Sequence, residues 1–141
     1  MKSKQKKQKY AQKYATYGKL VDELAKFDQT DPAYVIASTD LVSPDEGGNF
    51  VDGSAVKSVR IVSGVVKITC GDNGTMTWEQ IRTALRDQIT LNMVDQPAIV
   101  QIGYRGMADA NGRPCRQRRV KECGVIEGYD TIWNVELGPE V

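Results

Sequence analysis

The strongest strand signal in the chain is the stretch Val56-Lys57-Ser58-Val59-Arg60-Ile61-Val62-Ser63-Gly64-Val65-Val66-Lys67-Ile68-Thr69. Two runs rich in β-branched residues flank Ser63-Gly64, and a two-residue turn with glycine between such runs is typical of a tight hairpin. The sequence therefore predicts strands over residues 56–62 and 65–69. Nearer the C-terminus, residues 120–126 and 131–137 flank Glu127-Gly128-Tyr129-Asp130, which predicts a second hairpin.

The two hairpins belong to a pattern of three sequence blocks that occurs twice in the same order. The matched blocks are Thr16-Tyr17-x-x-Leu20-x-x-x-Leu24 with Thr77-Trp78-x-x-Ile81-x-x-x-Leu85, Pro32-Ala33-Tyr34-Val35 with Pro97-Ala98-Ile99-Val100, and Val56-Lys57-x-x-x-Ile61-Val62-x-Gly64 with Val120-Lys121-x-x-x-Val125-Ile126-x-Gly128. Their sequence offsets, by subtraction, are 61, 65 and 64 residues. Three blocks in order at a nearly constant offset indicate an internal duplication.

The first copy reads as a helix followed by strands. Leu20, Leu24 and Phe27 fall on one helical face. Asp31-Pro32 ends the helical region, because proline disfavours helical geometry in the residue before it. The apolar run over residues 33–37 predicts a buried strand, and the glycine-containing residues 39–54 predict a long loop before the hairpin.

The second copy carries a clearer helix start. Thr77 is a good N-cap and Gln80, three residues later, completes a capping box. Ile81, Leu85 and Ile89 then form an apolar stripe at helical spacing. Residues 98–104 predict a strand, followed by a loop with turn chemistry around residues 109–114.

These patterns predict an α+β fold, an internally duplicated unit of one helix plus three antiparallel strands (αβββ twice) sharing one core. The expected organisation is a basic N-terminal arm over residues 1–15 and a single domain over residues 16–141, with repeats 16–70 and 76–138. The connector, residues 71–75, is too short for an independent-domain linker, which favours one antiparallel sheet with both helices on one face. Trp78 and Trp133 lie on core-facing periodicities and are expected to pack inside.

Charge is strongly segregated along the chain. The 141 residues contain 19 Lys plus Arg, 18 Asp plus Glu and no His, a net charge of +1. Residues 1–19 hold seven lysines and no acid, which leaves 12 bases and 18 acids, a balance of −6, for residues 20–141. This pattern excludes a uniformly basic nucleic-acid binder, and the missing histidine excludes His-based triads and His metal ligands.

No motif fixes a reaction, so we expect no enzyme, no catalytic residues, no cofactor and no metal. The three cysteines, Cys70, Cys115 and Cys123, lack the spacing of a zinc site. They are expected to be reduced, packed thiols, with a Cys115–Cys123 bridge as the alternative. No apolar run approaches the length of a membrane-spanning helix, so no membrane partner is expected.

The basic arm is the first candidate contact segment. Three tyrosines at helical spacing would share one face and continue the apolar stripe of the first helix. The arm either docks on a partner through tyrosine and lysine, with strong salt dependence if it neutralises phosphates, or is a solvated extension. The candidate contact residues are Lys2, Lys4, Lys6, Lys7, Lys9, Tyr10, Lys13, Tyr14 and Tyr17.

The long loops of the two copies carry opposite charge. Residues 27–56 hold six acids and no base, whereas residues 103–121 hold six bases and one acid. The regions can associate head to tail, the bases can form an anion site, or the charges can simply be solvated. The candidate basic contacts are Arg113, Arg116, Arg118, Arg119 and Lys121, and the candidate acidic interface is Asp40, Asp45, Glu46 and Asp52.

A resemblance follows from Met76-Thr77-Trp78-Glu79-Gln80-Ile81 and Asp95-Gln96-Pro97-Ala98-Ile99-Val100. This helix cap and strand entry resembles small uncharacterised proteins of tailed phages and mobile elements, over roughly residues 16–37 and 76–102. The resemblance implies a phage-type origin and an accessory or virion role, and it brings no catalytic residues.

The sequence favours a non-enzymatic structural or interaction protein, phage-encoded and located in a virion or the host cytoplasm. Its expected partners are protein subunits, either copies of itself or other virion proteins, contacted through the basic arm and the oppositely charged loops. Two alternatives remain: a nucleic-acid-binding accessory protein that uses the arm and the Arg-rich loop, and a small inhibitor of a host enzyme.

Overall fold

The computed structural model describes residues 14–39, 48–104, 106–109, 112–126 and 128–141. Its elements follow in the order α2 (Tyr17–Leu24), β1 (Tyr34–Thr39), β2 (Gly48–Val62), β3 (Val65–Cys70), α3 (Trp78–Gln88), β4 (Ile99–Tyr104), β5 (Arg118–Ile126) and β6 (Tyr129–Glu140).

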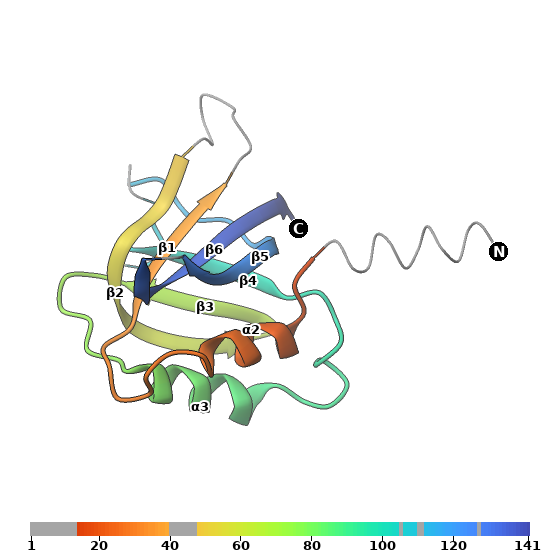
Figure 1. Ribbon diagram of the computed structural model, residues 1–141. Coiled ribbons are helices and arrows are strands. Elements are labelled where there is room, and N and C mark those ends of the chain that lie inside the picture. Colours follow the sequence, from red (N-terminus) through yellow and green to blue (C-terminus); the bar gives the residue numbers. More distant parts are fainter. Residues whose placement is uncertain (1–13, 40–47, 105, 110–111, 127) are drawn as a thin grey trace.

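The six strands close into one barrel in sequence order, with β6 returning to β1 (Figure 1). Neighbouring strands are antiparallel except at two places, where β3 pairs with β4 and β6 pairs with β1 in parallel. Side chains alternate between the buried and the exposed side along β1 and β3, as a strand with one face against the core requires. Closure leaves the inward-facing residues to fill a single apolar interior.

The β2–β3 hairpin forms at Ser63-Gly64 as the sequence predicts. Both turn residues have positive φ, 51° and 80°, which is the geometry of the two-residue turn that matches the twist of paired strands. β2 also bends where its register against β1 shifts between Val35 and Ala37, and Gly53 takes a φ of 65° at this bulge. The bend lets one 15-residue strand pair with β1 at one end and β3 at the other.

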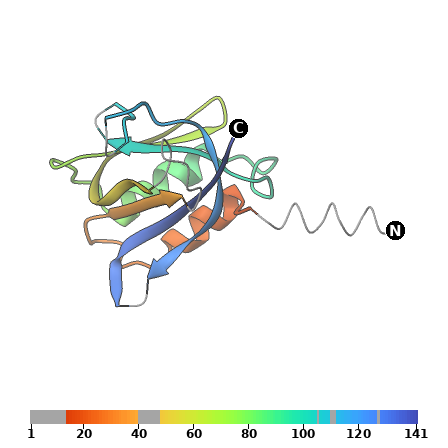
Figure 2. The same cartoon turned by 90° about the horizontal axis from the view of Figure 1, so that it is seen from above.

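Both helices lie side by side against one side of the barrel (Figures 1 and 2). Thr77 forms the predicted capping box of α3, with side-chain and backbone hydrogen bonds exchanged with Gln80. Phe27 follows α2 and stacks on Trp78 of α3 at 3.8 Å between ring centroids. Trp78 and Trp133 are fully buried, so the prediction that they are core residues is confirmed.

The predicted fold class, an α+β domain of two αβββ units, is wrong. The structure is 49% strand and its described residues contain only two short helices, so the fold is β-rich. The strands form a closed barrel rather than one antiparallel sheet. The parallel β3–β4 pairing links the first three strands to the last three, and the parallel β1–β6 pairing closes the barrel. Part of the predicted loop over residues 39–54 is also strand, since β2 begins at Gly48.

Candidate interaction site

The segment that precedes α2 is fixed to the barrel wall at Tyr14 and Ala15. The Ala15 N–H donates to the Val120 carbonyl at 2.7 Å, and the Ala98 N–H donates to the Ala15 carbonyl at 2.9 Å. The Arg119 guanidinium lies 5.6 Å from the centroid of the Tyr14 ring, a cation–π contact. The N-terminal arm therefore starts from a defined point beside β5.

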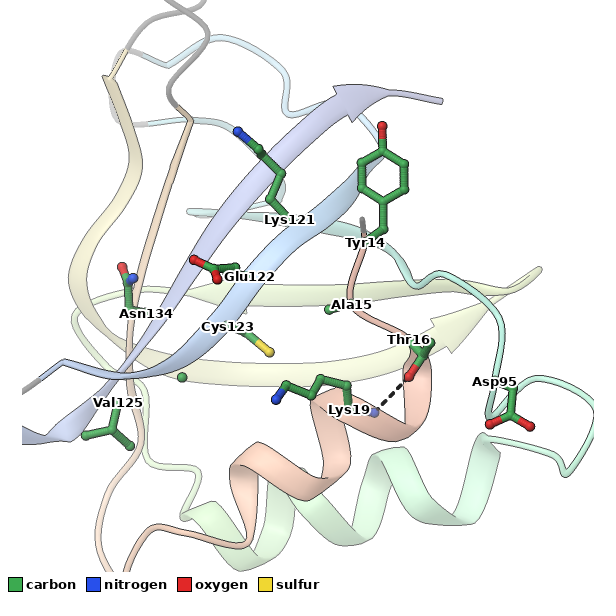
Figure 3. A pocket seen from close by; sticks show the side chains of 11 residues that line it. Tyr14, Ala15, Thr16, Lys19, Asp95, Lys121, Glu122, Cys123, Val125 and Asn134 are labelled. Atoms are coloured by element: carbon green, nitrogen blue, oxygen red, sulfur yellow. Dashed lines mark hydrogen bonds between the residues drawn. The ribbon is translucent and has the colours of Figure 1, made fainter. Parts of the chain in front are cut away.

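An open groove of about 710 Å³ lies next to this point, between α2 and β5 (Figure 3). The Cys123 side chain points from β5 toward α2, and the Lys19 side chain runs along the groove from α2. The lining residues are Tyr14, Ala15, Thr16, Lys19, Asp95, Lys121, Glu122, Cys123, Gly124, Val125 and Asn134. The arm thus begins at the rim of this groove.

The groove lies where β5 continues beyond its pairing with β4. β4 pairs with β5 only at two positions, through Arg118 and Arg119, so beyond them the edge of β5 faces α2 instead of a strand. By contrast, α3 is hydrogen-bonded directly to the strand beside it. The Ile61 N–H of β2 donates to the side-chain carbonyl of Gln88, at the end of α3, at 2.9 Å. α2 has 8 residues and lies beside the edge of β5, where the Glu23 carboxylate is close to Gly124.

A buried carboxylate holds the lysines of α2 in place. Glu23 is 5% exposed and accepts from Lys19 at 2.9 Å and from Lys26 at 3.0 Å. Burial would raise the pKa of Glu23, but the hydrogen bonds from both lysines outweigh it and keep this pKa below its ordinary value. The same hydrogen bond raises the pKa of Lys19. Lys19 of α2 and Lys26, which follows the helix, therefore share one carboxylate.

The charge left over in the groove is negative. Lys121 pairs with Glu136 at 3.8 Å, so both lining lysines already have a carboxylate. Asp95 and Glu122 are exposed, and neither forms an ion pair with a described residue. In Figure 3 Asp95 lies near Thr16, at one end of the groove, and Glu122 lies on β5 toward the other end. The groove can thus attract a cationic segment along its length.

The three cysteines are free thiols, and Cys70 and Cys115 are buried. Burial raises the pKa of Cys70 to about 12, of Cys115 to about 11 and of Cys123 to about 12. For Cys123 the nearby Glu23 carboxylate adds to the effect of burial. A protonated thiol is a weak nucleophile and a weak metal ligand, so these residues act chiefly as apolar packing groups.

The predicted arm contacts lie mostly outside the described residues. This applies to Lys2, Lys4, Lys6, Lys7, Lys9, Tyr10 and Lys13. Tyr14 and Tyr17 do not share a helical face, because α2 begins at Tyr17 and Thr16 is its extended N-cap. Tyr17 is buried, with its hydroxyl donating to the Gly64 carbonyl, so it belongs to the core.

The predicted basic cluster is largely engaged within the chain. Arg116 pairs with Glu140 at 3.2 Å, and the buried Arg118 donates to the Gly138 carbonyl at 3.1 Å. Arg119 covers Tyr14. The Arg113 main-chain N–H donates to the Asp109 carboxylate at 2.8 Å. These residues therefore lie along the start of β5 and the loop before it without forming one open anion site.

The predicted acidic interface is described only in part, and the groove was not predicted. Asp40, Asp45 and Glu46 lie outside the described residues, and Asp52 lies on β2. The sequence contains no signal that places Asp95 and Glu122 on one groove, because this depends on the packing of β5 beyond its few pairs with β4.

No family model, no curated protein and no solved structure matches the chain. Among the described residues, no group of three or more His, Cys, Asp or Glu side chains is placed to hold a metal ion. In the same part of the chain, neither helix is long and apolar enough to cross a membrane.

Proposed function

We propose that this protein is a non-enzymatic interaction protein that associates with copies of itself through its basic arm, as a subunit of an assembly such as a phage virion. One observation carries the proposal: Tyr14 and Ala15 fix the arm to the wall of a rigid barrel, at the rim of an open groove. Anchoring one end of a segment reduces the ordering cost of a specific contact.

The charge pattern supports contact with a carboxylate-bearing protein surface. Residues 1–13 contain six lysines and no acid, whereas residues 20–141 carry a balance of −6. Opposite charges on two parts of one chain favour head-to-tail or reciprocal association between copies.

Nucleic-acid binding is the second candidate, favoured by the same lysines. It has less support from the body of the protein, because Arg116 and Arg118 lie within reach of Glu140, and Arg119 covers Tyr14. Fluorescence anisotropy with labelled DNA and RNA over a salt series would detect it as a steep slope that falls when the arm is removed.

Light scattering over a concentration series tests the proposal on the full-length chain and on a variant that lacks residues 2–13. We expect the full-length protein to associate at low salt, to dissociate as salt screens the charges, and to be monomeric without the arm. A full-length protein that stays monomeric at every concentration and salt would refute the proposal.

A further inference from the structure

We propose that the groove between α2 and β5 binds the N-terminal arm of a second copy, so that two copies exchange arms reciprocally. This inference rests on the proposed self-association and names its site. The proposed occupant is residues 1–13, which would add in extended form along the edge of β5 beyond Val120 and place lysines against Asp95 and Glu122.

The first support is charge. Lys19 and Lys121 are matched by Glu23 and Glu136, which leaves Asp95 and Glu122 as the exposed carboxylates of the groove that have no ion pair with a described residue. The segment best suited to them is the arm, whose six lysines have no acid among them. Opposite charges on two parts of one chain can pair between copies.

The second support is the strand edge. Past Arg119 the Val120 carbonyl accepts from the Ala15 N–H, and beyond Val120 no described strand pairs with β5 on the side of the groove, although β5 continues to Ile126. An extended peptide can pair with such an edge through main-chain hydrogen bonds, while alternate side chains reach the groove walls. Lys2, Lys4 and Lys6 recur at every second position, so in an extended segment they share one face.

The third support is the position and length of the arm. Thirteen extended residues reach about 43 Å, enough to cross from one copy to another. Because Tyr14 lies at the rim of the groove, a twofold arrangement brings each arm to the other groove.

Charge reversal in the groove is the first test. The double variant Asp95→Lys/Glu122→Lys should weaken self-association by about tenfold or more, because two attractive contacts become repulsive. The matched control is Glu79→Lys/Asp87→Lys, which makes the same change in net charge on two exposed positions of α3 outside the groove. Near-UV circular dichroism confirms that each variant keeps its packing. Equal weakening by both variants would overturn the inference.

Complementation is the second test and separates exchange from other contacts. A chain that lacks residues 2–13 keeps its groove, and the Asp95→Lys/Glu122→Lys chain keeps its arm. Each should be monomeric alone, and a mixture should form a one-to-one heterodimer in light scattering. A mixture that stays monomeric would show that the arm does not use this groove.

The two proposals fail in different ways. If removal of the arm abolishes association but charge reversal in the groove leaves it unchanged, the arm binds elsewhere, such as the acidic residues 40–52, and only the groove assignment is overturned. If removal of the arm leaves association unchanged, or the wild-type chain is monomeric throughout, the proposed function and this inference both fail.

Discussion

At the residue scale, Glu23 is the clearest polar element of the interior. It is buried beside β5 and accepts from two lysines whose side chains are 52% and 61% exposed. Solvent screens the lysine ends of these contacts, so their net contribution to stability is modest. Their main effect is to fix the side chain of Lys19, which forms one wall of the groove.

We expect Glu23→Gln to lower the free energy of unfolding by about 1 kcal/mol at pH 7. The pKa of Glu23 in the folded protein lies below its ordinary value of 4.5, so the stabilisation is complete above that value and is lost as the pH falls through the folded-state pKa. Urea unfolding at pH 7 and at about pH 3 measures the difference. The control is Asp22→Asn on the exposed side of α2, and a cost for Glu23→Gln that is independent of pH would contradict the account.

The cysteines give a second prediction. Their raised pKa values, about 12 for Cys70 and Cys123 and about 11 for Cys115, leave well under roughly one thiol in a thousand ionised near neutral pH. Native protein should therefore react with iodoacetamide far more slowly than protein in urea, by mass spectrometry. Rapid labelling of Cys115 or Cys70 in the native state would show that the thiols are not packed as described.

At the element scale, the two helices start with caps of different strength. Thr77 exchanges two hydrogen bonds with Gln80, whereas Thr16 accepts one from the Lys19 N–H at 3.1 Å. Thr77→Ala should lower the free energy of unfolding by about 1 to 2 kcal/mol, and Thr16→Ala by a smaller amount. Thermal unfolding of the two variants measures the two losses of stability. An equal loss, or a larger loss for Thr16→Ala, would contradict the capping geometry.

Local elements could be predicted from the sequence because their signals are short-range. The capping box at Thr77, the apolar stripe that follows it and the turn at Ser63-Gly64 each depend on residues a few positions apart. The start of β2 at Gly48 could not be predicted, since residues 48–54 contain two glycines and become strand only by pairing with β1.

At the scale of the whole molecule, the sequence did not predict closure. β3 pairs with β4 and β1 pairs with β6 in parallel. The sequence pattern within a strand does not indicate which other strand will pair with it. The groove could not be predicted from the sequence for the same reason. The charge of the arm is visible in the sequence, but the groove arises where β5 continues past its two pairs with β4, beside the start of α2.

The proposed association between copies depends on the opposite charges of the arm and the body. Residues 1–13 carry six lysines, the body is acidic, and the arm begins at a fixed point beside the unmatched Asp95 and Glu122. Complementary charge of this kind guides encounter and sets register more than it adds affinity.

Carbodiimide crosslinking of an equal mixture of ¹⁴N- and ¹⁵N-labelled full-length protein tests this claim most directly, because the reagent joins a lysine amine to a carboxylate only in contact. Mass spectrometry should find crosslinks of mixed isotope between lysines of residues 2–13 and Glu122 or Asp95. Crosslinks confined to one isotope, or formed between copies only at other carboxylates, would contradict arm exchange through the groove.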